Sequence, residues 1–122
     1  MKRVISVAIL VLLLATPAWA ILSLFPNYVA KDYEEVVVDN TAGGVSLTAS
    51  KLNKVQAALV RQEGGPIRIR MDGGAPTTTS GFLVNDGDVF ELTPGELTAF
   101  RAIRTGSTSG KLFVTYYKLP QD

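Results

Sequence analysis

Apolar and polar residues alternate in short stretches along the chain, and glycine-containing turns separate these stretches. The clearest stretch is Ile67–Asp72, in which isoleucine and methionine alternate with arginine. A period of two is typical of a β-strand that buries one face. All eleven glycines lie between Gly43 and Gly110, so turn signals recur at short intervals. Short strands with frequent turns predict an all-β fold, a small antiparallel sandwich of about seven or eight strands of the jelly-roll or immunoglobulin-like kind.

The same pattern predicts six further strands and the turns between them. Asn85-Asp86-Gly87 has the composition of a hairpin turn that needs positive φ, and Pro94-Gly95 indicates another turn. The four phenylalanines after residue 80 are expected in the core. The six strands are predicted at Tyr33–Asp39, Val45–Thr48, Thr77–Val84, Asp88–Thr93, Leu97–Arg104 and Lys111–Leu119, and the core phenylalanines are Phe82, Phe90, Phe100 and Phe113.

Residues 48–62 fit two descriptions. Apolar residues recur at helical spacing from Leu52 to Leu59, and Ser50 is a suitable N-cap for a short helix. Alternatively, a strand runs from Val55 to Gln62 and forms a hairpin with Ile67–Asp72 through Gly64-Gly65. We favour the strand, because a Gly-Gly-Pro link between two apolar runs is typical of a hairpin loop.

The N-terminus has the three-part pattern of a secretory signal peptide. Lys2 and Arg3 precede the apolar stretch Val4–Ala15, and small residues at Ala18 and Ala20 follow. We expect cleavage after Ala20, which would place the protein in the periplasm, at the cell surface or outside the cell. Residues 21–32 are then a linker or arm, and residues 33–122 form the β-domain.

An uncleaved anchor is the alternative for the same segment. The apolar run continues to Phe25, so residues 4–25 approach the ~20 residues needed to cross a bilayer. In that case the protein is membrane-anchored or part of a virion. We favour cleavage, because the Ala-x-Ala end follows the helix-breaking Pro17.

Composition excludes several kinds of chemistry. The 122 residues include no cysteine and no histidine, so disulfides, Cys-His and Ser-His-Asp catalysis and histidine-based zinc sites are ruled out. The net charge is +1, and it becomes −1 when Lys2 and Arg3 leave with the leader. We therefore expect no nucleic-acid partner, and no membrane contact unless residues 4–25 are retained as an anchor.

The acidic residues suggest two kinds of site, both of which we disfavour. Asp86, Asp88 and Glu91 are dense enough to hold Ca²⁺, but their spacing differs from an EF-hand loop and fits a solvated turn. A pair among Asp72, Glu91 and Glu96 would supply the two carboxylates for glycoside hydrolysis, but a small turn-rich domain has little material for a deep cleft. We expect no enzyme activity, metal or cofactor.

Arginine and tyrosine supply the candidate partner-binding residues. Arg68, Arg70, Arg101 and Arg104 form a stripe if their two strands are neighbours, suited to phosphate, carboxylate or a protein partner. We favour a solvated face balanced by Asp88, Glu91 and Glu96, with subunit contacts as the functional alternative. Tyr116 and Tyr117 point to opposite faces of one strand, so one of them lies in the core and the other at the surface or an interface. We take Tyr117 as the candidate interface residue.

Several short motifs lie along the chain between residues 46 and 117: Ser46-Leu47-Thr48, Ala58-Leu59-Val60, Pro66 to Gly73, Ala75-Pro76-Thr77, Gly81, Gly87-Asp88, Phe100 to Arg104 and Leu112 to Tyr117. Through these motifs the chain from Leu47 to Tyr117 resembles a small β-domain of tailed-bacteriophage structural proteins. The resemblance implies a virion-associated, non-catalytic role in multiple copies, such as capsid decoration or a minor head or tail component. The partners would be further copies and capsid or tail subunits.

A second similarity covers less of the chain. Ile69 to Thr77 with Ser80, and Phe100 to Ile103, are similar to the immunoglobulin-like C-terminal domains of chitobiase-type glycosidases. Those domains are accessory modules, so this similarity also implies a binding role without catalysis. The sequence therefore predicts a structural assembly module. The alternative is an exported or membrane-tethered module that binds a cell-surface polysaccharide or protein.

Overall fold

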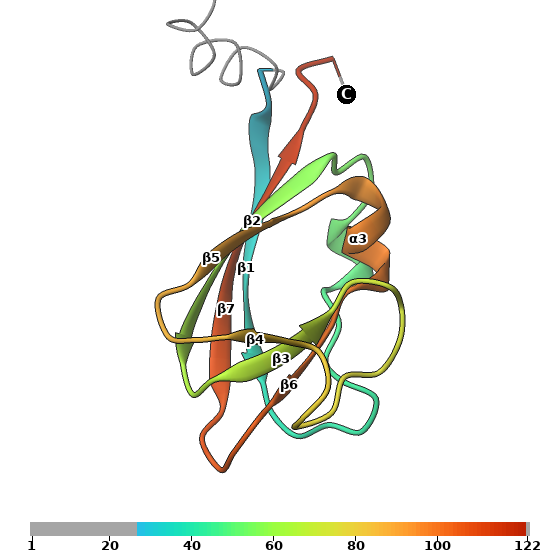
Figure 1. The fold of residues 1–122 in the computed structure, drawn as a ribbon. Coiled ribbons are helices and arrows are strands. Elements are labelled where there is room, and N and C mark those ends of the chain that lie inside the picture. The colour runs from blue at the N-terminus through green and yellow to red at the C-terminus, as the bar shows by residue number, and fades with distance from the viewer. Residues whose placement is uncertain (1–26, 122) are drawn as a thin grey trace, which may run out of the picture.

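The computed structural model describes residues 27–121, which form two antiparallel sheets with one short helix (Figure 1). The mostly-β, two-sheet prediction is confirmed. The four-stranded sheet has the order β1-β7-β2-β5, and the three-stranded sheet has the order β4-β3-β6. The strands are β1 (Val29–Val38), β2 (Ala57–Gly64), β3 (Ile67–Arg70), β4 (Phe82–Val84), β5 (Val89–Leu92), β6 (Arg101–Arg104) and β7 (Gly110–Lys118).

The predicted signal peptide, and the anchor alternative that ends near residue 25, lie outside the described residues. Strand β1 begins at Val29, so residues 29–32 belong to the sheet and not to a linker. Its first residue is paired with Lys118 at the end of β7, so the two ends of the described chain meet at one end of the molecule (Figure 1). Within the described residues, no helix is both long and apolar enough to cross a membrane.

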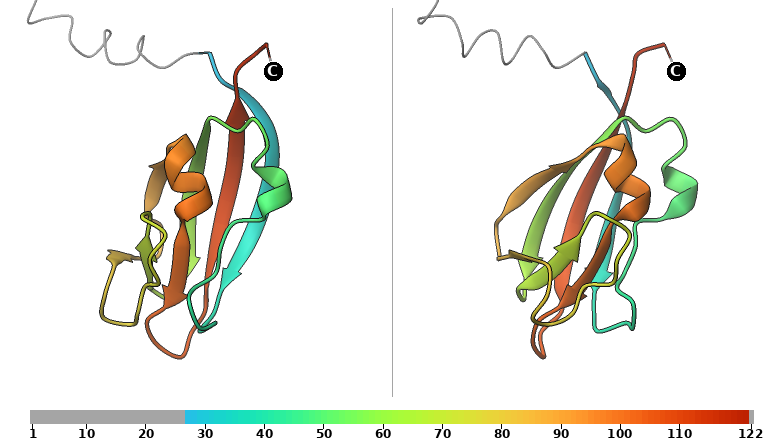
Figure 2. Two further views of the ribbon diagram at one scale, coloured as in Figure 1. Left: turned by 90° about the vertical axis from the view of Figure 1, so that its right-hand side faces the viewer. Right: turned by 45° about the vertical axis from the view of Figure 1, so that its right-hand side comes forward.

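The core lies between the two sheets and follows the alternation of the strands. In β3, Ile67 and Ile69 are buried while the arginines between them are partly exposed, as the period of two predicts. In β7 the inward residues Leu112, Val114 and Tyr116 are completely buried. Figure 2 shows the two layers edge-on, with β7 in the interior of the larger sheet.

Four of the connections cross from one sheet to the other, and two of these four were predicted to be hairpins, so those two predictions are wrong. Strands β2 and β3 belong to different sheets, and so do β4 and β5. The turn after β4 is attached to β2 instead: Gly87 N–H donates to the carbonyl of Gln62 (2.7 Å), and Asp86 accepts from Gly64 N–H (3.2 Å). Gly87 does have the positive φ that its composition predicts.

The link between β2 and β3 is held tightly against the loop that precedes β7. Gly65 N–H donates to the carbonyl of Ser109 (3.2 Å), and a Cβ at Gly65 would lie 2.2 Å from the Thr108 carbonyl oxygen. Glycine is therefore required here by space. The crossing between sheets depends on this close approach of two loops.

Residues 94–99 form the helix α3 (Pro94–Ala99) and Phe100 is its C-cap, so the predicted strand Leu97–Arg104 is wrong over its first four residues. Thr93 and Glu96 form a reciprocal capping box, and Pro94 occupies a first-turn position where its missing N–H costs nothing. The helix buries Leu97 against the core, near the end of the sandwich where β7 finishes (Figure 2). Strand β6 then begins at Arg101.

The segment before β2 is more irregular than either prediction. A single 3₁₀ turn, η1 (Ala49–Lys51), takes the place of the helical alternative. The preferred strand is confirmed from Ala57 onward. The predicted strand Val45–Thr48 is reduced to one bridge between Val45 and Ala102, and residues 77–80 of the predicted strand Thr77–Val84 form a turn.

Two of the four phenylalanines expected in the core lie elsewhere. Phe100 is buried and stacks against the partly buried Phe90, with ring centroids 6.1 Å apart. Phe82 is 66% exposed, because β4 is an edge strand. Phe113 lies on the solvent side of β7, between the inward residues Leu112 and Val114, beneath the ammonium of Lys111.

Substitution of Gly65 by alanine should destabilise the fold, because the new methyl group meets the backbone of Thr108. Overpacking of this kind costs about 1–3 kcal/mol of unfolding free energy. Urea denaturation measures the effect. The matched control is Gly106→Ala, which meets nothing within 4 Å and should lose no stability. Equal stability of the two variants would contradict the close packing of the loops.

Candidate functional site

The strands that carry the four candidate arginines are neighbours, as the stripe requires. Strand β3 pairs with β6, and Arg70 lies directly opposite Arg101. Arg68, Arg70 and Arg101 share the outer side of the three-stranded sheet. Arg104 is opposite the buried Ile67, so it belongs to the inner side at the end of β6.

Each of these four guanidinium groups binds an acceptor within the protein. Arg68 donates to the carbonyl of Gly81 (3.0 Å), Arg101 to that of Gly43 (3.4 Å) and Arg104 to the hydroxyl of Ser109 (3.3 Å). Arg70 makes two parallel hydrogen bonds to Asp72, with Nε–Oδ1 at 3.0 Å and Nη2–Oδ2 at 2.6 Å. The stripe therefore holds loops against the sheet.

The acidic candidates are engaged in turns and caps. The Arg70 guanidinium and the backbone N–H of Gly74 lower the pKa of Asp72 to about 2. Asp88 accepts from the backbone N–H of Asn85 (2.8 Å), and Glu96 accepts from that of Thr93 (2.8 Å). Over residues 27–121, no three or more Asp or Glu side chains gather in a group that could hold a metal ion.

Tyr116 and Tyr117 do lie on opposite faces, so that prediction is confirmed. Tyr116 is completely buried, and its hydroxyl donates to Glu34 on β1. Thr48 N–H donates to the same carboxylate oxygen (3.1 Å). Sequence reasoning missed Glu34, although its position in the alternation of β1 shows that it faces inward.

Burial and hydrogen bonding act in opposite directions on Glu34. Burial alone would raise its pKa, but the hydrogen bonds donated by Thr48 and Tyr116 outweigh burial and lower the pKa below its ordinary value of 4.5. Burial and the adjacent Glu34 carboxylate raise the pKa of Tyr116 far above its ordinary value, so its hydroxyl remains a donor. This pair joins the edge strand β1 to the central strand β7.

Tyr117 belongs to the outer face of the four-stranded sheet, which we call the tyrosine face. Strand register places 14 residues on it: Ala30, Tyr33, Glu35 and Val37 of β1, Lys111, Phe113, Thr115 and Tyr117 of β7, Ala57, Leu59, Arg61 and Glu63 of β2, and Val89 and Glu91 of β5. Val37 and Val89 are 55% and 56% exposed, and Tyr33 is 48% exposed. No described element packs on this face (Figure 2).

Charged side chains on the tyrosine face pair with one another between the apolar ones. Lys111 Nζ lies 2.9 Å from Glu35 and 5.7 Å from the centre of the Phe113 ring. Arg61 Nε lies 3.4 Å from Glu63. The Lys111 ammonium, followed by the Tyr33 hydroxyl, lowers the pKa of Glu35. Most of the charge on this face is thus already neutralised.

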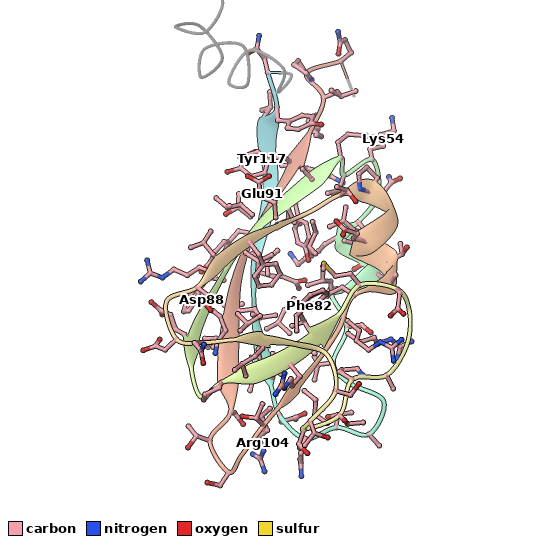
Figure 3. The ribbon with its side chains drawn as sticks, in the orientation of Figure 1. Lys54, Phe82, Asp88, Glu91, Arg104 and Tyr117 are labelled. Carbon is pink, nitrogen blue, oxygen red and sulfur yellow. The ribbon has the colours of Figure 1, made fainter. Side chains whose placement is uncertain are left out.

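The tyrosine face ends in a hollow of about 340 Å³ beside Tyr117. Its walls come from β2, β5 and β7, and from the start of α3. It is lined by Tyr28, Gln56, Ala57, Ala58, Leu59, Glu91, Leu92, Thr93, Pro94 and Tyr117. Figure 3 labels Tyr117 and Glu91 at this end of the molecule. Of the five candidate residues, Tyr117 is the one that lies on an open apolar surface. Sequence reasoning missed the other residues of the tyrosine face, although the alternation of exposed and buried positions in β1 and β7 was the signal for them.

Comparisons with protein families, with curated proteins and with solved structures found no match.

Replacement of Tyr116 by phenylalanine should lower the free energy of unfolding at pH 7 by about 1.5–3 kcal/mol, because a hydrogen bond to a charged group is lost. Glu34 has a lowered pKa in the folded state, so its contribution is present above 4.5 and is lost as the pH falls through the folded value. The difference between variant and natural protein should therefore shrink below pH 4.5.

Urea denaturation at neutral and acidic pH measures this difference. Tyr117→Phe is the matched control, since it removes a hydroxyl from the outward side of the same strand, and it should change stability by less than about 0.5 kcal/mol. A loss for Tyr116→Phe that is equally large at pH 7 and pH 3 would show that the hydroxyl does not act through the Glu34 carboxylate.

Proposed function

We propose that this protein is a non-enzymatic assembly module that self-associates through the tyrosine face. The observation that carries the proposal is a four-stranded sheet whose outer side exposes Tyr33, Val37, Leu59 and Val89 together. Grouped apolar residues of this kind on a sheet face mark an interaction surface.

The charges on the tyrosine face favour a second copy as the partner. Burial of an unpaired charge is costly, but Lys111 is paired with Glu35 and Arg61 with Glu63 within the face. In a two-fold dimer the tyrosine faces of the two copies meet, so apolar side chains of one copy can cover those of the other without burying an unpaired charge from these two ion pairs. The absence of enzyme activity in this proposal is supported by the acidic side chains that were candidates for catalysis. The carboxylate of Asp72 is paired with Arg70, and that of Glu96 caps α3.

The resemblance to phage structural domains supports a virion as the site of assembly, as capsid decoration or a minor head or tail component. The signal-peptide pattern supports export, or anchoring if residues 4–25 are retained. Both contexts place a multimeric β-module outside the cytoplasm or on a particle surface.

Recognition of a cell-surface polysaccharide or protein is the second candidate. It is favoured by the placement of Tyr33 on β1 diagonally between Phe113 and Tyr117 on β7. Aromatic rings spaced along neighbouring strands offer stacking surfaces to sugar rings. The partly exposed side chains of Phe113 and Tyr117 leave this surface open.

For the finer fold class we propose an immunoglobulin-like variant. The β2–β5 and β3–β6 pairs correspond to pairs that an immunoglobulin domain makes between its second and fifth and its third and sixth strands. The last strand departs from that pattern, because β7 lies between β1 and β2 and not beside β6.

Multi-angle light scattering of the natural protein tests self-association. We expect a multimer at micromolar concentration, and we expect Leu59→Glu to weaken it at least 100-fold by placing a charge in the middle of the tyrosine face. Leu83→Glu is the matched control on the outer side of the other sheet, where Leu83 is 48% exposed, and should leave the multimer intact.

Other outcomes separate the two candidates. A monomer whose migration is retarded in a polysaccharide gel, with the retardation lost in Tyr33→Ser, would replace self-association with sugar recognition. A monomer without such retardation would contradict both uses of the tyrosine face.

A further inference from the structure

Phe82 has a position in the sheet that does not match its exposure. It pairs with Ile69 across β3 and β4, so the two side chains lie on the same, inward side of the three-stranded sheet. Ile69 is 3% exposed, but Phe82 is 66% exposed. An inward-facing phenylalanine is therefore open to solvent at the border between the two sheets.

Phe82 lines two neighbouring hollows. The first measures about 460 Å³ and is lined by Arg70, Met71, Asp72, Ser80, Gly81 and Phe82. The second measures about 300 Å³ and is lined by Ile69, Met71, Phe82, Val84, Asp88, Val89, Phe90 and Glu91. Met71 and Phe82 line both hollows. The second hollow lies between β4 and β5, and we call it the β4–β5 groove. Figure 3 labels Phe82, Asp88 and Glu91 around it.

Strands β4 and β5 are both edge strands of their sheets. Among the described strands, β5 pairs with β2 and β4 pairs with β3. Alternate N–H and C=O groups of an antiparallel edge strand point away from its partner and remain available for another strand. A strand added beside β5 would direct every second side chain into the groove, toward Met71, Phe82 and Phe90.

The charge around the groove favours a basic segment. In the first hollow, Arg70 is neutralised by Asp72. The charged residues that line the second hollow are Asp88 and Glu91, which are both acidic and exposed. A lysine or arginine beside the apolar positions of an added strand would lie close to these carboxylates.

We propose that the β4–β5 groove binds an extended peptide segment of a partner protein by strand addition to β5. The segment has apolar side chains at alternate positions and lysine or arginine next to them. Backbone hydrogen bonds to the edge of β5 supply affinity, and the hollows beside Phe82 select the side chains. This site borders the tyrosine face and shares Val89 and Glu91 with it, but it uses the free edge of β5 and does not depend on self-association.

Selection from a random dodecapeptide library displayed on phage tests the proposal with the natural protein as target. We expect enriched peptides that alternate apolar and polar residues and carry lysine or arginine. Synthetic versions should bind Phe82→Ser at least 10-fold more weakly than the natural protein. Leu83→Ser, on the adjacent residue but the opposite side of β4, is the matched control and should bind normally. Glu91→Gln should weaken binding and reduce its dependence on salt.

Amide hydrogen exchange locates the bound peptide. On peptide addition, exchange should slow at Val89 and Glu91 of β5, whose register leaves them facing away from β2. Peptides that bind Phe82→Ser as well as the natural protein, or that slow exchange in β1 and not in β5, would overturn the proposal. Failure to enrich any peptide would also overturn it, while a multimer lost only in Leu59→Glu would leave the proposed function standing.

Discussion

The position of β7 between β1 and β2 is the constraint on which the rest of the structure depends. Both edges of β7 are paired, and its inward residues Leu112, Val114 and Tyr116 are fully buried. The last strand of the chain therefore joins the first strand to the second, and the Tyr116–Glu34 hydrogen bond reinforces this junction. Without β7, β1 would have no partner in the sheet.

This arrangement decides which surfaces remain open. With β7 in the middle, the larger sheet ends at β5, the smaller ends at β4, and these two edges border the groove beside Phe82. The outer residues of β7, from Lys111 to Tyr117, become the centre of the tyrosine face. The two surfaces that we propose for docking are therefore a sheet face and a sheet edge.

Local pattern predicted the strands, but it did not predict how they are connected. The alternation of β3 was correct because its period of two directly reports burial. The helix α3 was missed although Thr93, Pro94 and Glu96 carry a capping signature, because the apolar residues after Pro94 also fit a strand. Whether a turn such as Asn85–Gly87 joins two strands of one sheet depends on the distant Gln62, which no local signal reports. The same limit hid the exposure of Phe82, since an edge position is set by the topology.

Native-state hydrogen exchange tests the central position of β7 most directly. Because both edges of β7 are paired, all amides from Leu112 to Tyr116 should exchange only through global unfolding. The amides of Val89 and Glu91, which face away from β2 on the edge strand β5, should exchange without it. The account is contradicted if the amides of β7 fall into two alternating classes, as those of an edge strand do, or exchange as fast as the free edge of β5.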